Sequence, residues 1–503
     1  MEGELKEVRE AYESGKTRSL SWRLSQLKAL LRLLYDKEDD IFKALEQDLG
    51  KHRAEAYRDE ACGSSDQVRQ LRNRQSAEMD DSKQGYPPVL ISVSVPLVAF
   101  PSRADIVPEP LGVVLIFSSW NFPIGLSLEP LIGAISAGNG IIIKPSELAP
   151  ESAEFLARSV SKYLDDKLVK VITGGPDAGQ KLLDHKWDKI FFTGNPRVGR
   201  IVMAAAAKHL TPVSLELGGK CPAIMDSLTN ARDRKIAVRR IIGGKWVACS
   251  GQACIGVDYI LVEEKFAPIL IDMLKATIKK FYPEFDTLSK IINKHHFQRL
   301  ASLIKDPSVA DTIVHGGSMD SDKLFIEPTI LLDPPLDAEI MTEEIFGPLL
   351  PVITVKKIED SIDFIRTRPK PLAIYAFTQD EKLKNRLVSE TSSGSLTFND
   401  TMLQYCLLLL LCAVPVCYRH LTIWRSWSKW IWTVSWQVLF RHVQSQEISD
   451  EEELPVGVFF QIPAMGWLET SLHALCFPLR LCLSSSPFVG SEAMIVSRID
   501  ELK

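Results

Sequence analysis

The first fifty residues alternate hydrophobic and polar positions with the period of amphipathic helices. Leucines recur at intervals of three or four residues between Leu20 and Leu34, which places them on one face. The pattern is broken near Asp36 to Asp40 and then continues to Leu49. This spacing predicts paired helices with a structural role.

Between Gly112 and Leu217 the pattern changes to short apolar runs rich in β-branched residues, and these runs alternate with stretches of helical periodicity. The predicted strands are Val113 to Phe117, Ile141 to Lys144, Val169 to Thr173, Lys189 to Phe192 and Val213 to Leu215. Such alternation is typical of βαβ units, whose strands are parallel. The sequence therefore predicts an α/β fold with a doubly wound parallel sheet.

A second α/β region is predicted after Leu217, where strand and helix patterns are mixed and many turns are bounded by proline. The composition changes abruptly after Thr401. Leu407 to Leu411 are consecutive leucines, and six of the ten tryptophans lie between Trp424 and Trp467. We therefore expect an N-terminal domain at 1–216, a second domain at 217–400 and a tail of different character at 401–503.

Length and charge narrow the function. A chain of 503 residues exceeds the size at which one core stops growing, so we expect several domains. Lys and Arg (59) nearly balance Asp and Glu (64), so the net charge of -5 argues against nucleic acid and favours a small-molecule partner. The charged N-terminus has no secretory signal, and the nine cysteines show no CxxC or zinc spacing. We expect a cytoplasmic protein with free thiols and no metal site.

One loop is a candidate phosphate site. The strand that ends at Phe192 runs into a loop in which Asn195 can cap the next helix and Pro196 can be its first residue. Gly194 would let a ligand approach the positive end of that helix. The spacing from Gly194 to Gly199 is Gly-x-x-x-x-Gly rather than GxGxxG, so by itself the loop is equally compatible with a plain turn.

Two further strand ends carry polar side chains. Lys144 and Glu147 lie at the carboxyl edge, where they could bind ribose hydroxyls, although a solvated charge pair is the commoner role. Asn121 follows the strand that ends at Phe117 and could donate to an oxyanion, although an Asn in such a place is usually a turn residue.

A carboxylate and a thiol are candidate reacting groups. Glu216 lies between apolar neighbours at a strand end, where burial could raise its pKa toward that of a general base, whereas a surface carboxylate is more common. Cys254 follows a turn of small residues that a substrate can approach. A lone cysteine is more often inert and buried, which is the role expected of Cys221 and Cys249.

From about Leu20 to Gln404 the chain resembles the aldehyde dehydrogenases, because six motifs occur in that family's order. They are WNFP at 120–123, AGN at 137–139 with KPSE at 144–147, FTG at 192–194, LELGGK at 215–220, GQAC at 251–254 and EEIFGP at 343–348. Within this family the chain most resembles class 3 enzymes of plant type, because it also contains DLGKH at 48–52, PLAIYAF at 371–377 and TSSG at 391–394.

This resemblance implies a Rossmann-like cofactor domain, a catalytic domain, a homodimer, and oxidation of an aldehyde to a carboxylic acid with NAD or NADP. Cys254 would form a thiohemiacetal and then a thioester, Asn121 and the Cys254 N–H would hold the oxyanion, and Glu216 would activate water. In the cofactor site, Lys144 and Glu147 would bind the adenosine ribose, and Glu344 and Phe346 would bind the nicotinamide ribose and ring. The pyrophosphate would be bound by Gly194, Asn195, Pro196, Arg197, Val198 and Gly199. Asn195 stands where the family more often has Ser.

The resemblance fails at about 62–85 and after about Gln404, and we hypothesise that the reading frame changes there. TGG read one nucleotide later begins with GG, so tryptophan codons become glycine codons. With suitable synonymous codons, residues 422–446 then read PFGGVGASGFGLYHGKFSFDMFSHK, which resembles the family's missing C-terminal segment. The same shift permits RYPPW around Met465 and a helical LVGVVIKSVNFAIAKVLRWMTAS at 61–83.

Alternatives stay open beside a working dehydrogenase. One is an impaired or unstable product of mis-splicing or of a faulty gene model, which would lack part of the catalytic domain. Another is a cysteine hydrolase that uses Cys254 and Glu216 without a cofactor. A membrane anchor at Tyr405 to Tyr418 is not favoured, because about 14 residues fall short of the roughly 20 that span a bilayer and Pro415 interrupts them.

Overall fold

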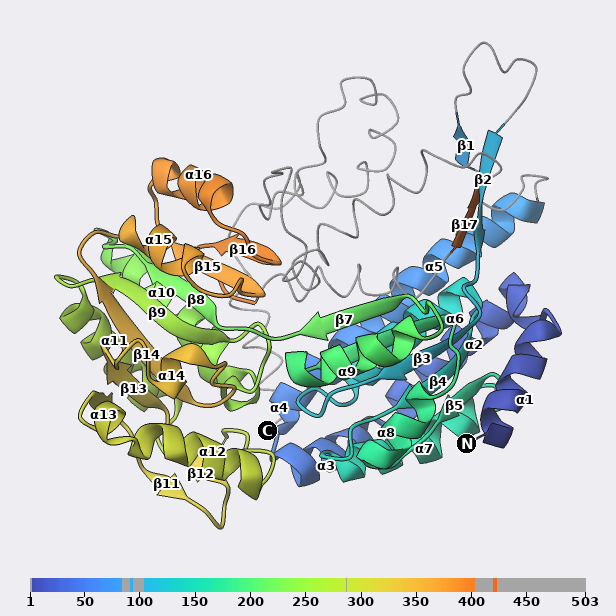
Figure 1. Ribbon diagram of the computed structural model, residues 1–503, viewed down its shortest axis with the longest axis horizontal. Coiled ribbons are helices and arrows are strands. Elements are labelled where there is room, and N and C mark those ends of the chain that lie inside the picture. The colour runs from blue at the N-terminus through green and yellow to red at the C-terminus, as the bar shows by residue number, and fades with distance from the viewer. Residues whose placement is uncertain (1, 84–90, 94–103, 286, 403–418, 423–503) are drawn as a thin grey trace. The chain divides into compact units, whose positions relative to one another are not determined.

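The N-terminal helices build the first part of the fold (Figure 1). The computed structural model describes residues 2–83, 91–93, 104–285, 287–402 and 419–422. The N-terminal elements are α1 (Glu2–Glu13), η1 (Lys16–Arg18), α2 (Leu20–Asp36), α3 (Glu38–Leu49), α4 (Arg53–Ala56), η2 (Tyr57–Cys62) and α5 (Gly63–Lys83). The predicted helix pair is confirmed as α2 and α3, and the break between them is the single residue Lys37. Gly50, with φ +63°, ends α3.

A five-stranded parallel sheet forms the centre of the N-terminal half. Its order is β5-β4-β3-β6-β7, and every neighbouring pair is parallel. Its strands are β3 (Val113–Phe117), β4 (Gly140–Lys144), β5 (Val169–Val171), β6 (Lys189–Gly194) and β7 (Val213–Leu217). All five predicted strands are confirmed, with ends that differ by at most two residues. The chain order reverses between β3 and β6, and open α/β sheets bind ligands at the carboxyl ends beside such a reversal.

Helices cover both faces of this sheet. They are α6 (Gly125–Ala137), α7 (Pro150–Tyr163), α8 (Pro176–Leu183) and α9 (Pro196–Ala207), together with the N-terminal helices. Alternate strand residues enter two hydrophobic clusters: Val114 packs with residues of α2, α6 and α7, whereas Leu115 packs with residues of α1, α8 and α9. Because both faces are covered, the central strands β3 and β4 are fully buried and almost entirely apolar, which explains their continuous runs in the sequence.

The second half contains a seven-stranded sheet with the order β10-β13-β14-β9-β8-β15-β16. Its strands are β8 (Cys221–Met225), β9 (Val257–Glu263), β10 (Ile313–His315), β13 (Thr329–Leu332), β14 (Leu349–Val355), β15 (Ala373–Phe377) and β16 (Ser395–Phe398). All neighbours are parallel except β10 on β13. Its helical elements are α10 (Ala231–Ile242), η4 (Gly243–Val247), η5 (Cys249–Gly251), α11 (Ala267–Phe281), α12 (Lys294–Lys305), α13 (Pro307–Ala310), α14 (Glu339–Thr342), α15 (Asp360–Arg366) and α16 (Glu381–Glu390). The predicted α/β class is confirmed for both halves.

Two small antiparallel sheets complete the described elements. One joins β11 (Met319–Asp320) to β12 (Phe325–Ile326), and the other has the order β1-β2-β17. In it β2 (Ala104–Glu109) pairs with β1 (Ile91–Val93) and with β17 (Arg419–Thr422). Among the residues described, no helix combines the length and the apolar character needed to cross a membrane.

The regions singled out for a change of frame are only partly described. Residues 63–83 form α5, which packs against α2 and α6. The residues beyond 402, apart from β17, lie outside the described residues, as does the proposed anchor segment 405–418. The domain limits at 216 and 400 stay proposals, which the assignment of β7 to the first sheet and β8 to the second supports.

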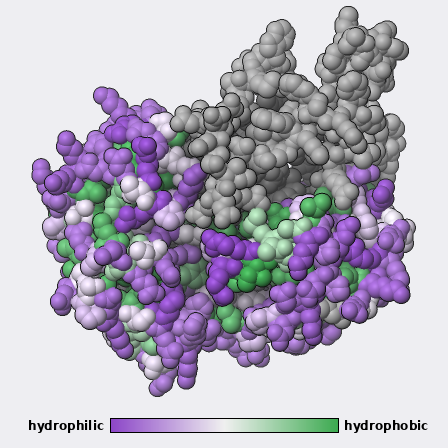
Figure 2. Space-filling view, viewed as in Figure 1, coloured by the Kyte–Doolittle hydropathy of each residue, from purple (hydrophilic) through white to green (hydrophobic). Residues whose placement is uncertain are grey.

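The visible face of the described residues is mainly hydrophilic, with a hydrophobic area near α9 (Figure 2). Ile201 and Met203 of α9 are 46% and 40% exposed, and Leu210 shortly after it is 90% exposed. Single exposed apolar residues of this kind are common on globular proteins and do not define a binding surface.

Candidate active site

The turn before Cys254 has an uncommon backbone conformation. Cys249 and Ser250 have φ values of +51° and +50°, and Gly251 follows with φ +80°. L-residues avoid the left-handed region at a cost of about 1 to 2 kcal/mol each, so surrounding contacts must hold this turn. The chain thereby doubles back sharply and brings the partly buried Cys254 to the start of β9.

The Gln252 side chain supplies several of those contacts. Its Nε2 donates to the Cys249 and Lys290 carbonyl oxygens, both at 3.0 Å, and its Oε1 accepts from the Ile292 N–H at 3.2 Å. Gln252 is fully buried, so these bonds do not compete with water. Sequence reasoning missed this residue, although it lies inside the GQAC motif.

Gly251→Ala is expected to destabilise the protein by about 2 to 4 kcal/mol, because φ is positive and an added Cβ would lie 2.3 Å from the Gly347 carbonyl oxygen. Gly243→Ala is the matched control, since a Cβ there meets nothing within 4 Å and φ is -57°. Denaturant unfolding of both variants provides the measurement. Equal stability of the two variants would contradict the strain assigned to this turn.

Asn121 lies beyond the carboxyl end of β3 and links the first half of the chain to the turn before Cys254. Its Nδ2 donates to the Gln252 carbonyl oxygen at 2.9 Å, and its side chain is buried. A carboxamide has two N–H donors, so this bond leaves the second one for another acceptor. The structure thus brings together Asn121 and Cys254, which are 133 positions apart in the sequence.

The surroundings of Cys254 disfavour the thiolate form of its side chain. Burial raises its pKa to about 12, and the Glu344 and Glu216 carboxylates add to this effect. The backbone N–H groups of Ile255 and Cys254 act in the opposite direction by hydrogen bonding to sulfur. The pKa of Glu344 is itself about 8, so this carboxyl is largely neutral at pH 7 and opposes the thiolate less there.

Glu216 lies near the carboxyl end of β7, and its pKa is raised in the direction predicted for a base. Burial raises its pKa to about 7. Within the part of the chain that the structure describes, its Oε1 is buried and has no hydrogen-bond partner. A carboxyl that titrates near neutrality and keeps a free acceptor can take a proton from water at physiological pH.

Glu344 and Phe346 lie between α14 and β14. Glu344 Oε1 accepts from the Gly219 N–H at 3.0 Å, and a Cβ on Gly218 would lie 2.4 Å from either carboxylate oxygen. Burial raises the pKa of Glu344. Phe346 has φ +50°, and its ring centroid lies 5.3 Å from that of Trp120, which belongs to the same motif as Asn121.

A buried ion pair holds this 343–346 segment, and the sequence did not single it out. Lys220 Nζ binds the Asp258 carboxylate and donates to the carbonyl oxygens of Ile340 and Glu343 at 2.8 and 2.9 Å. Asp258 Oδ2 accepts from the Ile345 N–H at 2.9 Å. Lys220 was visible within the LELGGK motif, but Asp258 carried no signal without its partner.

The remaining predicted cofactor residues lie at the carboxyl ends of β4 and β6. Lys144 Nζ binds the Glu147 carboxylate, with side chains 7% and 36% exposed. Asn195 caps α9, since its side chain accepts from the Val198 N–H at 2.9 Å, and Pro196 is the first residue of the helix. Asn195, Pro196 and Arg197 are exposed, Gly194 and Val198 are partly buried, and Gly199 is buried.

This edge fits a dinucleotide. The N-terminus of α9 presents the positive end of its helix to a phosphate, and the ion pair at β4 offers a donor and an acceptor for hydroxyl groups. The Thr193 hydroxyl beside the loop is buried and has no hydrogen-bond partner among the described residues. Cys221 and Cys249 have the buried character expected of them, because both are fully buried and burial raises the pKa of each.

Comparison with known proteins agrees with this geometry. The model of the aldehyde dehydrogenase family, whose members are NAD(P)-dependent oxidoreductases, matches residues 2–406. "Aldehyde dehydrogenase family 3 member F1" of Arabidopsis thaliana is 57% identical over 409 residues, which are 80% of this chain and 83% of that protein. "Aldehyde dehydrogenase family 3 member I1, chloroplastic" of the same plant is 50% identical over 79% of this chain and 71% of that protein.

Solved structures give the same result. AldH of Staphylococcus aureus, solved in a substrate-bound state, has a TM-score of 0.78 and 36% identity, and the match covers 85% of this chain and 94% of that one. The family match ends at residue 406, close to Gln404, where the resemblance was expected to end. It runs through 62–85 without a reported break, so the frame hypothesis for that segment stays untested. The chain belongs to the aldehyde dehydrogenase family.

Proposed function

We propose that this chain oxidises an aldehyde to a carboxylic acid with NAD(P)+, with Cys254, Glu216 and Asn121 as its catalytic residues. Membership of the family supports the overall reaction. The observation that carries the assignment of roles is the hydrogen bond from Asn121 to the turn of Cys254, beside a carboxyl that titrates near pH 7. The comparisons favour this function over the impaired product considered above.

The first step is the addition of sulfur to the carbonyl carbon. The Cys254 thiolate forms a C–S bond, and the carbonyl oxygen becomes an oxyanion. The second amide N–H of Asn121 and the backbone N–H of Cys254 are the donors for this charge. Such donors, placed in a buried site before the reaction, stabilise the oxyanion more than water does.

Bound NAD(P)+ would supply the acceptor for the hydride, which leaves a thioester on Cys254. Lys144 and Glu147 would hold the adenosine ribose, residues 194–199 the pyrophosphate, and Glu344 with Phe346 the nicotinamide ribose and ring. Lys144, Glu147 and residues 194–199 lie at the carboxyl edge of the first sheet. Glu344 contacts Gly219 after β7, and Phe346 contacts Trp120 after β3, which supports a single extended binding site.

Hydrolysis of the thioester falls to Glu216. Its carboxylate takes a proton from water, the water oxygen attacks the thioester carbon, and the C–S bond breaks to return the Cys254 thiolate. One aldehyde, one NAD(P)+ and one water thus give one carboxylic acid, one NAD(P)H and one proton. The pKa of about 7 lets the same carboxyl accept that proton and release it to solvent.

The test is turnover by the purified full-length chain with a series of aldehydes and NAD+ or NADP+. We expect equal amounts of acid and NAD(P)H, and mass spectrometry of quenched reactions should find an acyl adduct on the Cys254 peptide. Ester cleavage without cofactor, and no aldehyde oxidation, would favour a cysteine hydrolase. No turnover by well-folded protein would favour the impaired product.

The cellular location and the oligomeric state of the protein are also proposals. We propose a cytoplasmic enzyme acting on a small-molecule aldehyde, and a homodimer as the resemblance implies, without a membrane anchor. Cell fractionation and sedimentation measure these properties. The frame hypothesis for 62–85 and for the tail is tested by sequencing the transcript, and an intact printed frame through codons 62–85 and 404–470 would refute it.

A further inference from the structure

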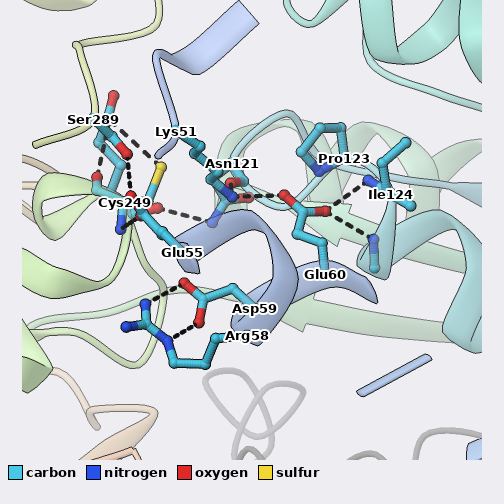
Figure 3. A network of polar contacts seen from close by, with 12 residues as sticks. Lys51, Glu55, Arg58, Asp59, Glu60, Asn121, Pro123, Ile124, Cys249 and Ser289 are labelled. Atoms are coloured by element: carbon cyan, nitrogen blue, oxygen red, sulfur yellow. Dashed lines mark hydrogen bonds and ion pairs between the residues drawn. The ribbon is translucent and has the colours of Figure 1, made fainter. Parts of the chain in front are cut away.

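Three charged residues that were not predicted to be site residues are buried close to the candidate active site (Figure 3). Lys51, Glu55 and Glu60 lie in one short stretch between α3 and the end of η2, and they are 1%, 8% and 0% exposed. Burying a charge is unfavourable unless it is paired and hydrogen-bonded. Their partners therefore indicate what this stretch holds in place.

The Lys51–Glu60 ion pair binds the turn that carries Asn121. Lys51 Nζ lies 2.6 Å from Glu60 Oε1 and donates to the Asn121 carbonyl oxygen at 2.8 Å. Glu60 Oε2 accepts from the N–H groups of Ile124 and Gly125, both at 2.9 Å. The pair thus holds the turn at its first residue and again where α6 begins.

Glu55 binds the nucleophile turn in the same way. Its Oε1 accepts from the Cys249 N–H at 2.7 Å, and its Oε2 accepts from the Ser289 hydroxyl at 2.8 Å. The Ser250 hydroxyl in turn donates to the Ser289 carbonyl oxygen at 2.6 Å. Within this turn Cys249 and Ser250 are the two L-residues with positive φ, so Glu55 contacts the part of the turn that most needs support.

We propose that residues 51–60 are a clamp that sets the position of the Asn121 amide relative to the Cys254 sulfur. Lys51, Glu55 and Glu60 are positioning residues, and none of them touches a reacting atom. The inference rests on the proposed function, because it assigns these residues to the oxyanion site of that reaction. One short helical stretch contacts both turns, so it constrains their separation.

Position matters here because the donor must meet an oxyanion that exists only after sulfur has added. Displacement by about 1 Å can lower a rate about 100-fold. The Asn121 to Gln252 bond links the two turns directly, but a single bond between two loops still allows them to move as a pair. The clamp adds contacts at 121, 124, 125 and 249 from one side.

The first test is the double variant Lys51→Met with Glu60→Gln, which removes both charges together and keeps an acceptor for the N–H groups of α6. We expect the single-turnover rate constant for NAD(P)H formation, per titrated active site, to fall about 10- to 100-fold. The KM for NAD(P)+ and the alkylation rate of Cys254 by iodoacetamide should stay within about twofold, because those sites are not altered.

The second test compares Glu55→Ala with Glu55→Gln. The amide oxygen of Gln can still accept from the Cys249 N–H while its NH2 donates to Ser289, so Glu55→Gln should retain most activity. Glu55→Ala leaves the Cys249 N–H unpaired and should change both the single-turnover rate constant and the alkylation rate of Cys254. If the double variant does not fold, the comparison of these two variants still tests whether Glu55 positions the turn before Cys254.

Asp165→Asn is the control for a general loss of stability, because it weakens an ion pair to Lys16 (2.6 Å) at the opposite end of the first sheet. We expect a lower Tm with an unchanged rate constant per active site. If the clamp variants behave in that way too, their role is only structural and the inference is wrong. An unchanged alkylation rate in Glu55→Ala would also overturn the clamp. Absence of turnover by the wild-type protein would instead contradict the proposed function itself.

Discussion

Cys254→Ala is expected to lower kcat for aldehyde-dependent NAD(P)H formation by more than about 10³-fold, as removal of a catalytic nucleophile generally does. No other described thiol can replace it. Cys221 and Cys249 are fully buried, and burial raises the pKa of both, so neither forms an accessible thiolate. The variant should fold normally, because a smaller side chain at a partly buried position leaves the Gln252 contacts in place. Initial rates and Tm, measured together, check this result.

The matched control is Cys62→Ala, since Cys62 is also partly buried and lies outside the proposed site. It should keep kcat within about twofold of wild type, as expected for a change away from the reacting atoms. Cys254→Ser retains the shape of the side chain and should still be nearly inactive, because a hydroxyl is a far weaker nucleophile than a thiolate. Substantial activity in Cys254→Ala would exclude Cys254 as the nucleophile.

Glu216→Gln is expected to separate the two halves of the reaction. Loss of a general base slows a step by about 10² to 10⁴-fold, and here the slowed step is hydrolysis of the thioester. NAD(P)H should then form once per active site in a rapid burst and almost stop, while the acyl adduct on Cys254 accumulates. Stopped-flow absorbance with mass spectrometry of the quenched protein measures both. Loss of the burst itself would instead assign Glu216 to the first half.

The pH dependence follows from the direction of the same shift. In wild type, hydrolysis of the thioester should rise as pH increases through about 7, where Glu216 becomes a carboxylate. Glu216→Gln should lack this rise. A rise of equal size in both proteins would show that another group is responsible for it.

Stability should change in the opposite sense to activity. Because the folded-state pKa of Glu216 is raised above its unfolded value, its contribution to stability is fully present below about 4.5 and is lost as pH rises through about 7. Above pH 7 the Glu216→Gln variant should therefore be more stable than wild type, by on the order of 2 kcal/mol, and the difference should shrink toward pH 5. Denaturant unfolding at the two pH values measures it.

Much of the fold could be predicted because it depends on local patterns. The central strands β3 and β4 of the first sheet are buried on both faces, which produces continuous apolar runs that are visible without a structure. The helix pair α2 and α3 is equally visible, because its leucines share one face. Strand order in the second sheet was beyond such reasoning, since β9 pairs with β14 and β8 pairs with β15, which are distant from them in the sequence.

The candidate site divides in the same way. Short motifs contain Cys254, Glu216, Asn121 and the cofactor residues, and the chain shares the order of these motifs with a family. The sequence alone therefore determined which reaction to expect. Lys51, Glu55, Glu60 and Asp258 lie outside the motifs that pointed to this chemistry. Only the tertiary structure decided that they support the site, because a buried charge is recognised by its partners, and those partners are up to 234 residues away.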